Sequence, residues 1–232
     1  MVTLAVSAGL AFPTWAQDEI RDQGGISSPL LSRCAGKFGA QLRAGDQAFP
    51  LLSLMGEPWM KIERTDQRAD GAHVVAIVTG IGARSRRRGQ IVGFNFRCLI
   101  DDKGEAVSFT ANNLMPERHE SLPPAMVVRG TAYYTPRTQL PKGAELRVQL
   151  FDQAADPPTL LTETVVRSSW EEPIPFGLRL PPDLKLQGRK LALAVRLARG
   201  SSPLYGLRQP IALDLDRLQR PIDLTIDSVA DQ

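Results

Sequence analysis

Prolines and glycines are spread along the whole chain and limit the length of any regular element. There are 18 prolines and 19 glycines in 232 residues. Because proline inside a helix removes a backbone hydrogen bond and clashes with the preceding turn, long helices do not fit this pattern. The 43% hydrophobic fraction is ordinary for a globular protein. The sequence therefore predicts a folded, mostly β protein made of short strands joined by turns.

The first sixteen residues have the pattern of an export signal. Val2 to Phe12 is apolar, and Thr14-Trp15-Ala16 offers a small-x-small cleavage site before the polar Gln17-Asp18-Glu19. A basic stretch before the apolar run is missing, so the predicted signal peptide, residues 1–16, looks truncated. The alternative is a buried N-terminal strand or helix. The run is shorter than the roughly 20 residues of a membrane span and no later stretch qualifies, so we expect an exported periplasmic protein without an integral membrane anchor.

The two cysteines, Cys34 and Cys98, are predicted to form a disulfide. In an exported protein two distant thiols are more often paired than free. A zinc site would need about four ligands, and a catalytic thiol would need a histidine nearby. The two histidines, His73 and His119, are not close to either cysteine in sequence. Arg33 directly before Cys34 does not fit a bacterial lipobox, so we expect no lipid anchor.

Residues 27–115 are predicted to form an α+β domain in which a helix covers an antiparallel sheet. Apolar residues recur at helical spacing from Pro29 to Leu42, and Cys34 lies on that stripe. Val92, Phe94, Phe96 and Cys98 alternate along one strand and so share one face. The predicted strands are Trp59–Arg64, His73–Ile81, Gln90–Ile100 and Val107–Thr110.

A polar, proline-containing stretch from Asn112 to Pro124 is predicted to be a linker. Residues 125–215 are predicted to form an antiparallel β-sandwich, because short strands alternate with turn residues. Residues 216–232 are predicted to be a tail that frays or adds an edge strand. The strands expected in the second domain are Met126–Tyr134, Glu145–Asp152, Leu160–Arg167, Ile174–Leu180, Leu191–Ala198 and Ile211–Leu215.

The second domain also carries a series of short motifs in a characteristic order. They are Gly130-Thr-Ala-Tyr133-Tyr134, Arg137, Leu140-Pro141-Lys-Gly143-Ala144-Glu-Leu146, Val148-Gln-Leu150-Phe-Asp152, Pro173-Ile174-Pro175-Phe176, Leu178, Leu191-Ala-Leu193-Ala-Val195-Arg196-Leu197 and Pro203-Leu204-Tyr205. Residues 126–215 resemble the YbaY/YscW-type family of envelope β-sandwich proteins, the type III secretion lipoprotein chaperones or pilotins. Members are typically lipoproteins, so the missing lipobox departs from the family pattern.

The resemblance implies a chaperone-like module whose partner is another envelope protein. Arg196 is the odd residue in an apolar strand: it either points outward or marks a partner-facing surface. Tyr133, Tyr134 and Tyr205 are candidates for the same surface. The alternative function is a carbohydrate- or envelope-polymer-binding module, for which these three tyrosines and Trp170 are the candidate aromatic platforms.

No pattern in the sequence indicates catalysis. The two histidines lack a nucleophile partner, and Glu171 and Glu172 would face opposite sides of a strand. Asp152 and Asp156 fit turn caps better than catalytic acids. The basic cluster at residues 84–88 contains no aromatic residue for base stacking, so a solvated hairpin tip is favoured over a phosphate-binding patch. We expect no catalytic residue, cofactor, metal or nucleic acid partner, and the oligomeric state is open.

Overall fold

The computed structural model describes residues 27–45, 51–85, 91–113, 126–135, 139–168 and 173–229. The predicted signal peptide, residues 86–88 of the basic cluster and most of the predicted linker lie outside these residues. Strands dominate the described part, which confirms the mostly β class, and its helices are α2 (Ser27–Ala44) and α3 (Leu215–Leu218). The strands are β1 (Leu51–Met55), β2 (Met60–Ala69), β3 (Ala72–Ser85), β4 (Ile91–Asp101), β5 (Ala106–Asn113), β6 (Val127–Thr135), β7 (Glu145–Asp152), β8 (Thr159–Ser168), β9 (Ile174–Arg179), β10 (Leu191–Arg199), β11 (Ser202–Gly206), β12 (Ile211–Leu213) and β13 (Ile222–Ser228).

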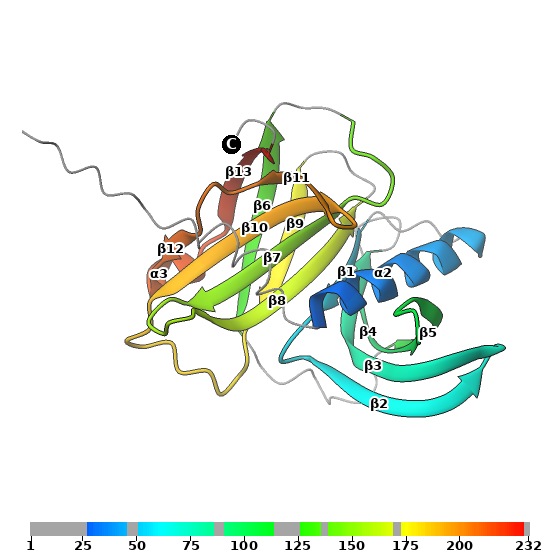
Figure 1. The fold of residues 1–232 in the computed structure, drawn as a ribbon. Coiled ribbons are helices and arrows are strands. Elements are labelled where there is room, and N and C mark those ends of the chain that lie inside the picture. Colours follow the sequence, from blue (N-terminus) through cyan, green and yellow to red (C-terminus); the bar gives the residue numbers. More distant parts are fainter. Residues whose placement is uncertain are drawn as a thin grey trace, which may run out of the picture.

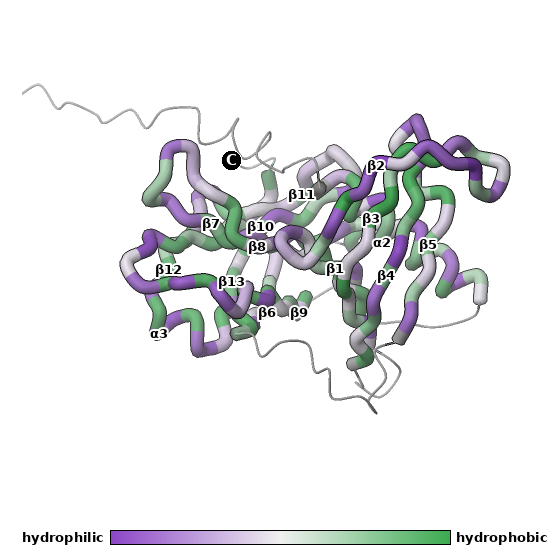
Figure 2. The backbone as a smooth tube through the Cα atoms, turned by 90° about the horizontal axis from the view of Figure 1, so that it is seen from below, coloured by the Kyte–Doolittle hydropathy of each residue, from purple (hydrophilic) through white to green (hydrophobic). Residues whose placement is uncertain are grey.

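Helix α2 packs on the antiparallel strands of the N-terminal half, as the sequence predicted (Figure 1). The predicted helix, Pro29 to Leu42, falls inside the observed Ser27–Ala44. Phe38 on the buried stripe stacks on Phe109 with 4.4 Å between ring centroids, and it meets Phe94 edge-on at 5.3 Å. Unlike the buried stripe of α2, strand β2 is largely hydrophilic along its length (Figure 2). The aromatic contacts therefore fix the helix on one face of the sheet.

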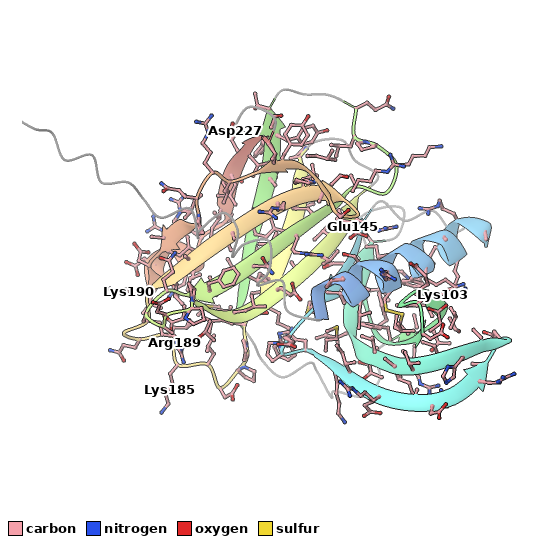
Figure 3. The ribbon with its side chains drawn as sticks, in the orientation of Figure 1. Lys103, Glu145, Lys185, Arg189, Lys190 and Asp227 are labelled. Carbon is pink, nitrogen blue, oxygen red and sulfur yellow. A yellow bond between two sulfur atoms is a disulfide. The ribbon has the colours of Figure 1, made fainter. Side chains whose placement is uncertain are left out.

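A disulfide joins α2 to β4, which confirms the predicted pairing. The sulfur atoms of Cys34 and Cys98 are bonded and the Cα atoms lie 5.9 Å apart. Both cysteines are 0% exposed, and the yellow sulfur bond is visible beneath the helix in Figure 3. Phe94, Phe96 and Cys98 share the helix-facing side because alternate residues of a strand point the same way. The helix is thus covalently attached to the row of aromatic side chains under it.

The two halves of the chain share one sheet, which the prediction of a separate antiparallel sandwich did not anticipate. β1, which the sequence analysis did not identify, pairs with β3 on one edge and with β8 on the other. The Ser53 and Thr164 hydroxyls lie 2.8 Å apart across the β1–β8 pair. On β8, Val165 packs in the core under α2 while Val166 packs in the larger C-terminal core. Adjacent residues of one strand therefore serve two cores on opposite faces of a continuous sheet.

In the C-terminal half the sheet curls over its own core. Strands β7, β8 and β10 cross in front of β6 and β9 in Figure 1, and buried aliphatic side chains of both layers form one cluster. The sheet is mixed rather than wholly antiparallel, because β13 and β6 run parallel. Between β8 and β9, Thr162 Oγ1 and Trp59 Nε1 each donate to the Arg179 carbonyl oxygen at 2.9 Å. Trp59, from the turn before β2, thus links the N-terminal half to the point where the curled sheet approaches itself.

The predicted tail needs correction over most of its length. β13 lies between β11 and β6 in the sheet, so it is neither frayed nor at an edge. Ile222, Leu224 and Ile226 alternate with exposed residues and are buried in the C-terminal core. A short segment can occupy such a place because its two neighbours, β11 and β6, supply backbone partners on both sides. Residues 216–229 are therefore part of the folded unit.

Two turns have the chemistry that their residues indicated. Gly143 has φ of +87° in the turn closed by the Ala144 N–H donating to the Pro141 carbonyl at 3.1 Å. Asp152 ends β7 and caps its turn, as predicted: its carboxylate accepts the Ala154 N–H at 2.9 Å and binds Arg189 Nη1 at 2.7 Å. Figure 3 shows Arg189 and Lys190 at this end of the sheet. The Ala154 N–H first, and then Arg189, hold the pKa of Asp152 below its usual range against the opposing effect of burial.

Because the folded state lowers this pKa, the Asp152 carboxylate stabilises the fold above its unfolded-state pKa of about 3.9. That contribution is lost as the pH falls from about 4 through the lower pKa of the folded state. We expect Asp152→Asn to reduce the free energy of unfolding by about 1–2 kcal/mol at pH 7 and by much less at pH 3. Urea unfolding at both pH values measures this, with the exposed Asp183→Asn as control. An equal loss of unfolding free energy at pH 7 and pH 3 would contradict the electrostatic explanation.

Candidate functional site

A cleft of about 520 Å³ lies between the first turns of α2 and the outer faces of β7 and β10. The turn between β10 and β11 and the loop after β11 complete its rim. Figure 3 shows Glu145 at the start of β7, on the side of the sheet next to α2. The described residues that line the cleft are Pro29, Ser32, Arg33, Glu145, Arg147, Gln149, Ala194, Val195, Arg196, Ala198, Gly200, Ser201, Pro203, Leu207 and Pro210.

Strand alternation explains why polar side chains form the floor of this cleft. On β7, Leu146, Val148 and Leu150 point into the C-terminal core, so the residues between them face the other side. The same alternation on β10 buries Leu193 and Leu197. In the register between the two strands, Arg147 lies directly opposite Arg196. The floor therefore carries two arginines side by side, with the small Ala194 and Ala198 flanking Arg196 along β10.

Hydrogen bonds hold the floor and the α2 wall in place. Arg147 Nη2 donates to Ser32 Oγ on α2 at 3.0 Å. The Glu145 carboxylate accepts from Arg167 Nε at 2.5 Å, with both side chains largely buried. Gln149 Nε2 donates to the carboxylate of Glu163 at 3.3 Å. The carboxylate of Glu145 is thus already bound by an arginine that does not itself line the cleft.

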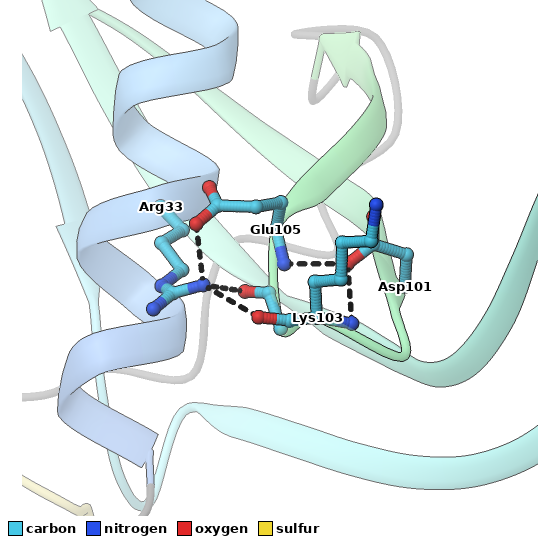
Figure 4. Close-up of polar contacts among 5 residues, drawn as sticks. Arg33, Asp101, Lys103 and Glu105 are labelled. Atoms are coloured by element: carbon cyan, nitrogen blue, oxygen red, sulfur yellow. Dashed lines mark hydrogen bonds and ion pairs between the residues drawn. The ribbon is translucent and has the colours of Figure 1, made fainter.

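Arg33 belongs to the same wall but is oriented by the turn between β4 and β5 (Figure 4). Its Nη1 donates to the Gly104 carbonyl oxygen and lies 2.8 Å from Glu105 Oε1. The Asp101 carboxylate accepts the N–H groups of Lys103 and Glu105 at 3.0 and 2.7 Å, which shapes the turn. With the disulfide, this contact fixes α2 at a second point beside the cleft.

The described lining has a positive balance, with three arginines against one glutamate. The first turn of α2, at the cleft, has no acidic residue, and a helix N-terminus is itself favourable for negative charge. Arg147 and Arg196 stand directly opposite each other on adjacent strands, so they concentrate positive charge on the floor of the cleft. Chemically, this arrangement is suited to holding an anionic group by charge-assisted hydrogen bonds.

Among the described residues that line the cleft there is no histidine, no cysteine and no pair of carboxylates. Within the described ranges, no group of three or more His, Cys, Asp and Glu residues is arranged to hold a metal ion. His73 lies on the β2–β3 hairpin, with Nε2 2.8 Å from Asp66 Oδ1 at the surface. His119 and the pair Glu171 and Glu172 lie outside the described residues.

The structure divides the predicted partner-facing residues. Arg196 lies in the cleft, whereas Tyr134 and Tyr205 are 2% and 7% exposed and pack together in the core with 5.1 Å between ring centroids. Assigning these two rings to a surface was therefore wrong, and they cannot be the platforms of a carbohydrate site. Tyr133 is half-buried on β6, and Trp170 lies outside the described residues.

Sequence reasoning missed Arg147 as a site residue, although its strand alternation placed it on the polar face of β7. The missing information was the register with β10, which sets it opposite Arg196. The contribution of α2 was also missed, because the contact between Ser32 and Arg147 joins residues 115 positions apart.

Comparison with known proteins agrees with the resemblance found in the sequence. Residues 123–209 match the family model of type III secretion system lipoprotein chaperones (YscW), and the N-terminal region matches no family model. Among solved structures, an alternative pilotin from the type II secretion system of Vibrio cholerae is similar at a TM-score of 0.41 and 16% identity, covering 46% of this chain and 98% of that chain. No curated protein matches this chain. In the described part, none of the helices has the length and apolar character needed to cross a membrane.

Proposed function

We propose that this chain is a non-catalytic, exported protein of the bacterial cell envelope that binds another envelope protein as a chaperone-like module. The match of residues 123–209 to lipoprotein chaperones supports this function. The single observation that carries it is the cleft, because β7 and β10, which form its floor, lie inside the matched segment. Helix α2, from outside that segment, adds a wall and makes the cleft a property of the whole chain.

The proposed location is the periplasm. A buried disulfide between α2 and β4 supports export, since disulfides persist in oxidising compartments and are rare in the cytosol. The sulfur of Cys34 is used in that bond, which supports the proposal that this cysteine carries no lipid. We propose two structural units, residues 27–115 and residues 125–229, the second extended from 215 to include β13. Their separate buried clusters support this division, although β1 and β8 pair across them.

In vivo photo-crosslinking tests the proposed function. Ser201 lies exposed on the rim of the cleft, and Thr110 lies exposed on β5 as a control position. With p-benzoylphenylalanine in place of Ser201, we expect one discrete adduct with an exported envelope protein, and none from Thr110. The amount of that envelope protein should fall several-fold when the gene for this chain is deleted. Absence of an adduct from both positions, or an adduct with unchanged partner levels after deletion, would argue against a chaperone role.

A further inference from the structure

We infer that the cleft recognises a short acidic segment of the partner chain, whose carboxylates bind between Arg147 and Arg196. This inference rests on the proposed function and adds the chemistry of the ligand. The two guanidinium groups come from directly opposite positions of β7 and β10. Arginine is the residue best suited to bind carboxylates, because its planar fork of N–H donors matches the two carboxylate oxygens.

The polar side chains next to Arg147 on β7 have hydrogen-bond partners of their own within the sheet. Glu145 is bound by Arg167 and Gln149 by Glu163, so both side chains are engaged within the sheet. Ser32 holds the Arg147 guanidinium from the α2 side. The flanking residues on β10, Ala194 and Ala198, are too small to cover Arg196 from its own strand.

The geometry of the sheet excludes one common mode of peptide binding at this place. β7 pairs with β8 and β10, and β10 pairs with β7, β11 and β12, so neither strand offers a free edge to an added strand. Recognition here must therefore come from side chains on the sheet face. The volume of about 520 Å³ is in the range of small-ligand pockets and accepts a few residues of an extended chain rather than a folded domain.

The rim of the cleft is largely apolar and suits the backbone and aliphatic parts of such a segment. Pro29 comes from α2, Pro203 from the start of β11, and Leu207 and Pro210 from the loop after β11. An arginine floor within an apolar rim raises the strength of a charge interaction, because water is partly excluded from it. The expected ligand is therefore acidic and extended, with its charges directed to the floor.

A labelled peptide tests this inference on the full-length oxidised protein. The probe is fluorescein-labelled hexaglutamate, with hexaglutamine as the neutral peptide, and binding is followed by fluorescence anisotropy at low ionic strength. We expect hexaglutamate to bind and hexaglutamine to bind at least tenfold more weakly. Arg147→Gln and Arg196→Gln should each weaken hexaglutamate binding at least tenfold. The control Arg129→Gln, which removes the same charge from an exposed position on β6, should change binding less than twofold.

Because Arg147→Gln also removes the bond to Ser32, Arg196→Lys serves as a second variant that keeps the charge and loses the planar fork. It should weaken binding about threefold or more while leaving the thermal unfolding midpoint unchanged. An equal loss of hexaglutamate affinity in Arg129→Gln and Arg196→Gln would show that the peptide is attracted nonspecifically by positive charge. That result would overturn the inference. Binding of phosphatidylglycerol vesicles that depends on Arg147 and Arg196, with hexaglutamate inert, would also overturn it.

The acidic residues of the chain's own N-terminal segment are another source of carboxylates. A variant with Asp18→Asn, Glu19→Gln and Asp22→Asn that binds hexaglutamate as the wild type does supports recognition of a partner. A tenfold gain in hexaglutamate affinity in that variant would identify the chain's own N-terminal segment as the occupant of the cleft. It would overturn the assignment to a partner. If the Ser201 adduct forms in cells while hexaglutamate does not bind, the acidic ligand fails and the proposed function stands; the reverse pattern defeats the proposed function.

Discussion

Replacing Cys34 and Cys98 together by alanine is expected to lower the free energy of unfolding by about 4 kcal/mol. The bond closes a loop with a sequence separation of 64 residues, and in the chain-entropy account a loop of that size corresponds to about 4 kcal/mol. Both sulfur atoms lie in the core under α2, so their removal also leaves a void beside the aromatic row. The helix should be the first element to loosen, because it loses its covalent attachment to β4.

Urea unfolding of the oxidised wild type and the double alanine variant measures this loss. Wild-type protein reduced with dithiothreitol should lose stability to a similar degree, while the reductant should leave the alanine variant unchanged. Thiol titration in denaturant should find no free thiol in protein isolated from the envelope and two after reduction. Two titratable thiols in native envelope protein, or a variant as stable as the wild type, would contradict the structural role of the bond.

Local patterns were sufficient to predict most of the N-terminal half. Helical spacing from Pro29 to Leu42 and alternation from Val92 to Cys98 placed both cysteines on buried faces that meet in the structure. The boundaries of β7, Glu145–Asp152, agree with the predicted strand. These elements could be found because their apolar residues recur with the period of a helix or a strand, and that period can be read from consecutive residues.

Relations between distant segments could not be predicted in the same way. β1 is only Leu51–Met55, and its place between β3 and β8 depends on two registers that no local period specifies. The cleft has the same difficulty, because Arg147 and Arg196 become neighbours only through the pairing of β7 with β10. The wrong placement of Tyr134 was avoidable, since Val128, Ala132 and Tyr134 alternate along β6 toward the core.

Removing the residues after Arg220 is expected to prevent the chain from folding cooperatively. A chain that ends after Arg220 lacks β13, which lies between β11 and β6. The loss separates β6 and β9 from the rest of the pairing order and removes Ile222, Leu224 and Ile226 from the core. Because sheet pairing and burial are lost together, we expect this chain to show no cooperative unfolding transition by circular dichroism and to expose its apolar core to a hydrophobic dye.

Point variants and a shorter truncation separate this effect from the mere loss of chain length. A chain ending after Val229 should unfold with the wild-type midpoint. Leu224→Ala should lower the free energy of unfolding by about 3 kcal/mol, as expected for a buried leucine. The adjacent Thr225→Ala, at an exposed position of the same strand, should change it by less than about 0.5 kcal/mol. If the chain ending after Arg220 instead unfolded cooperatively near the wild-type midpoint, β13 would be an accessory strand, and the C-terminal core would be closed by the strands before it.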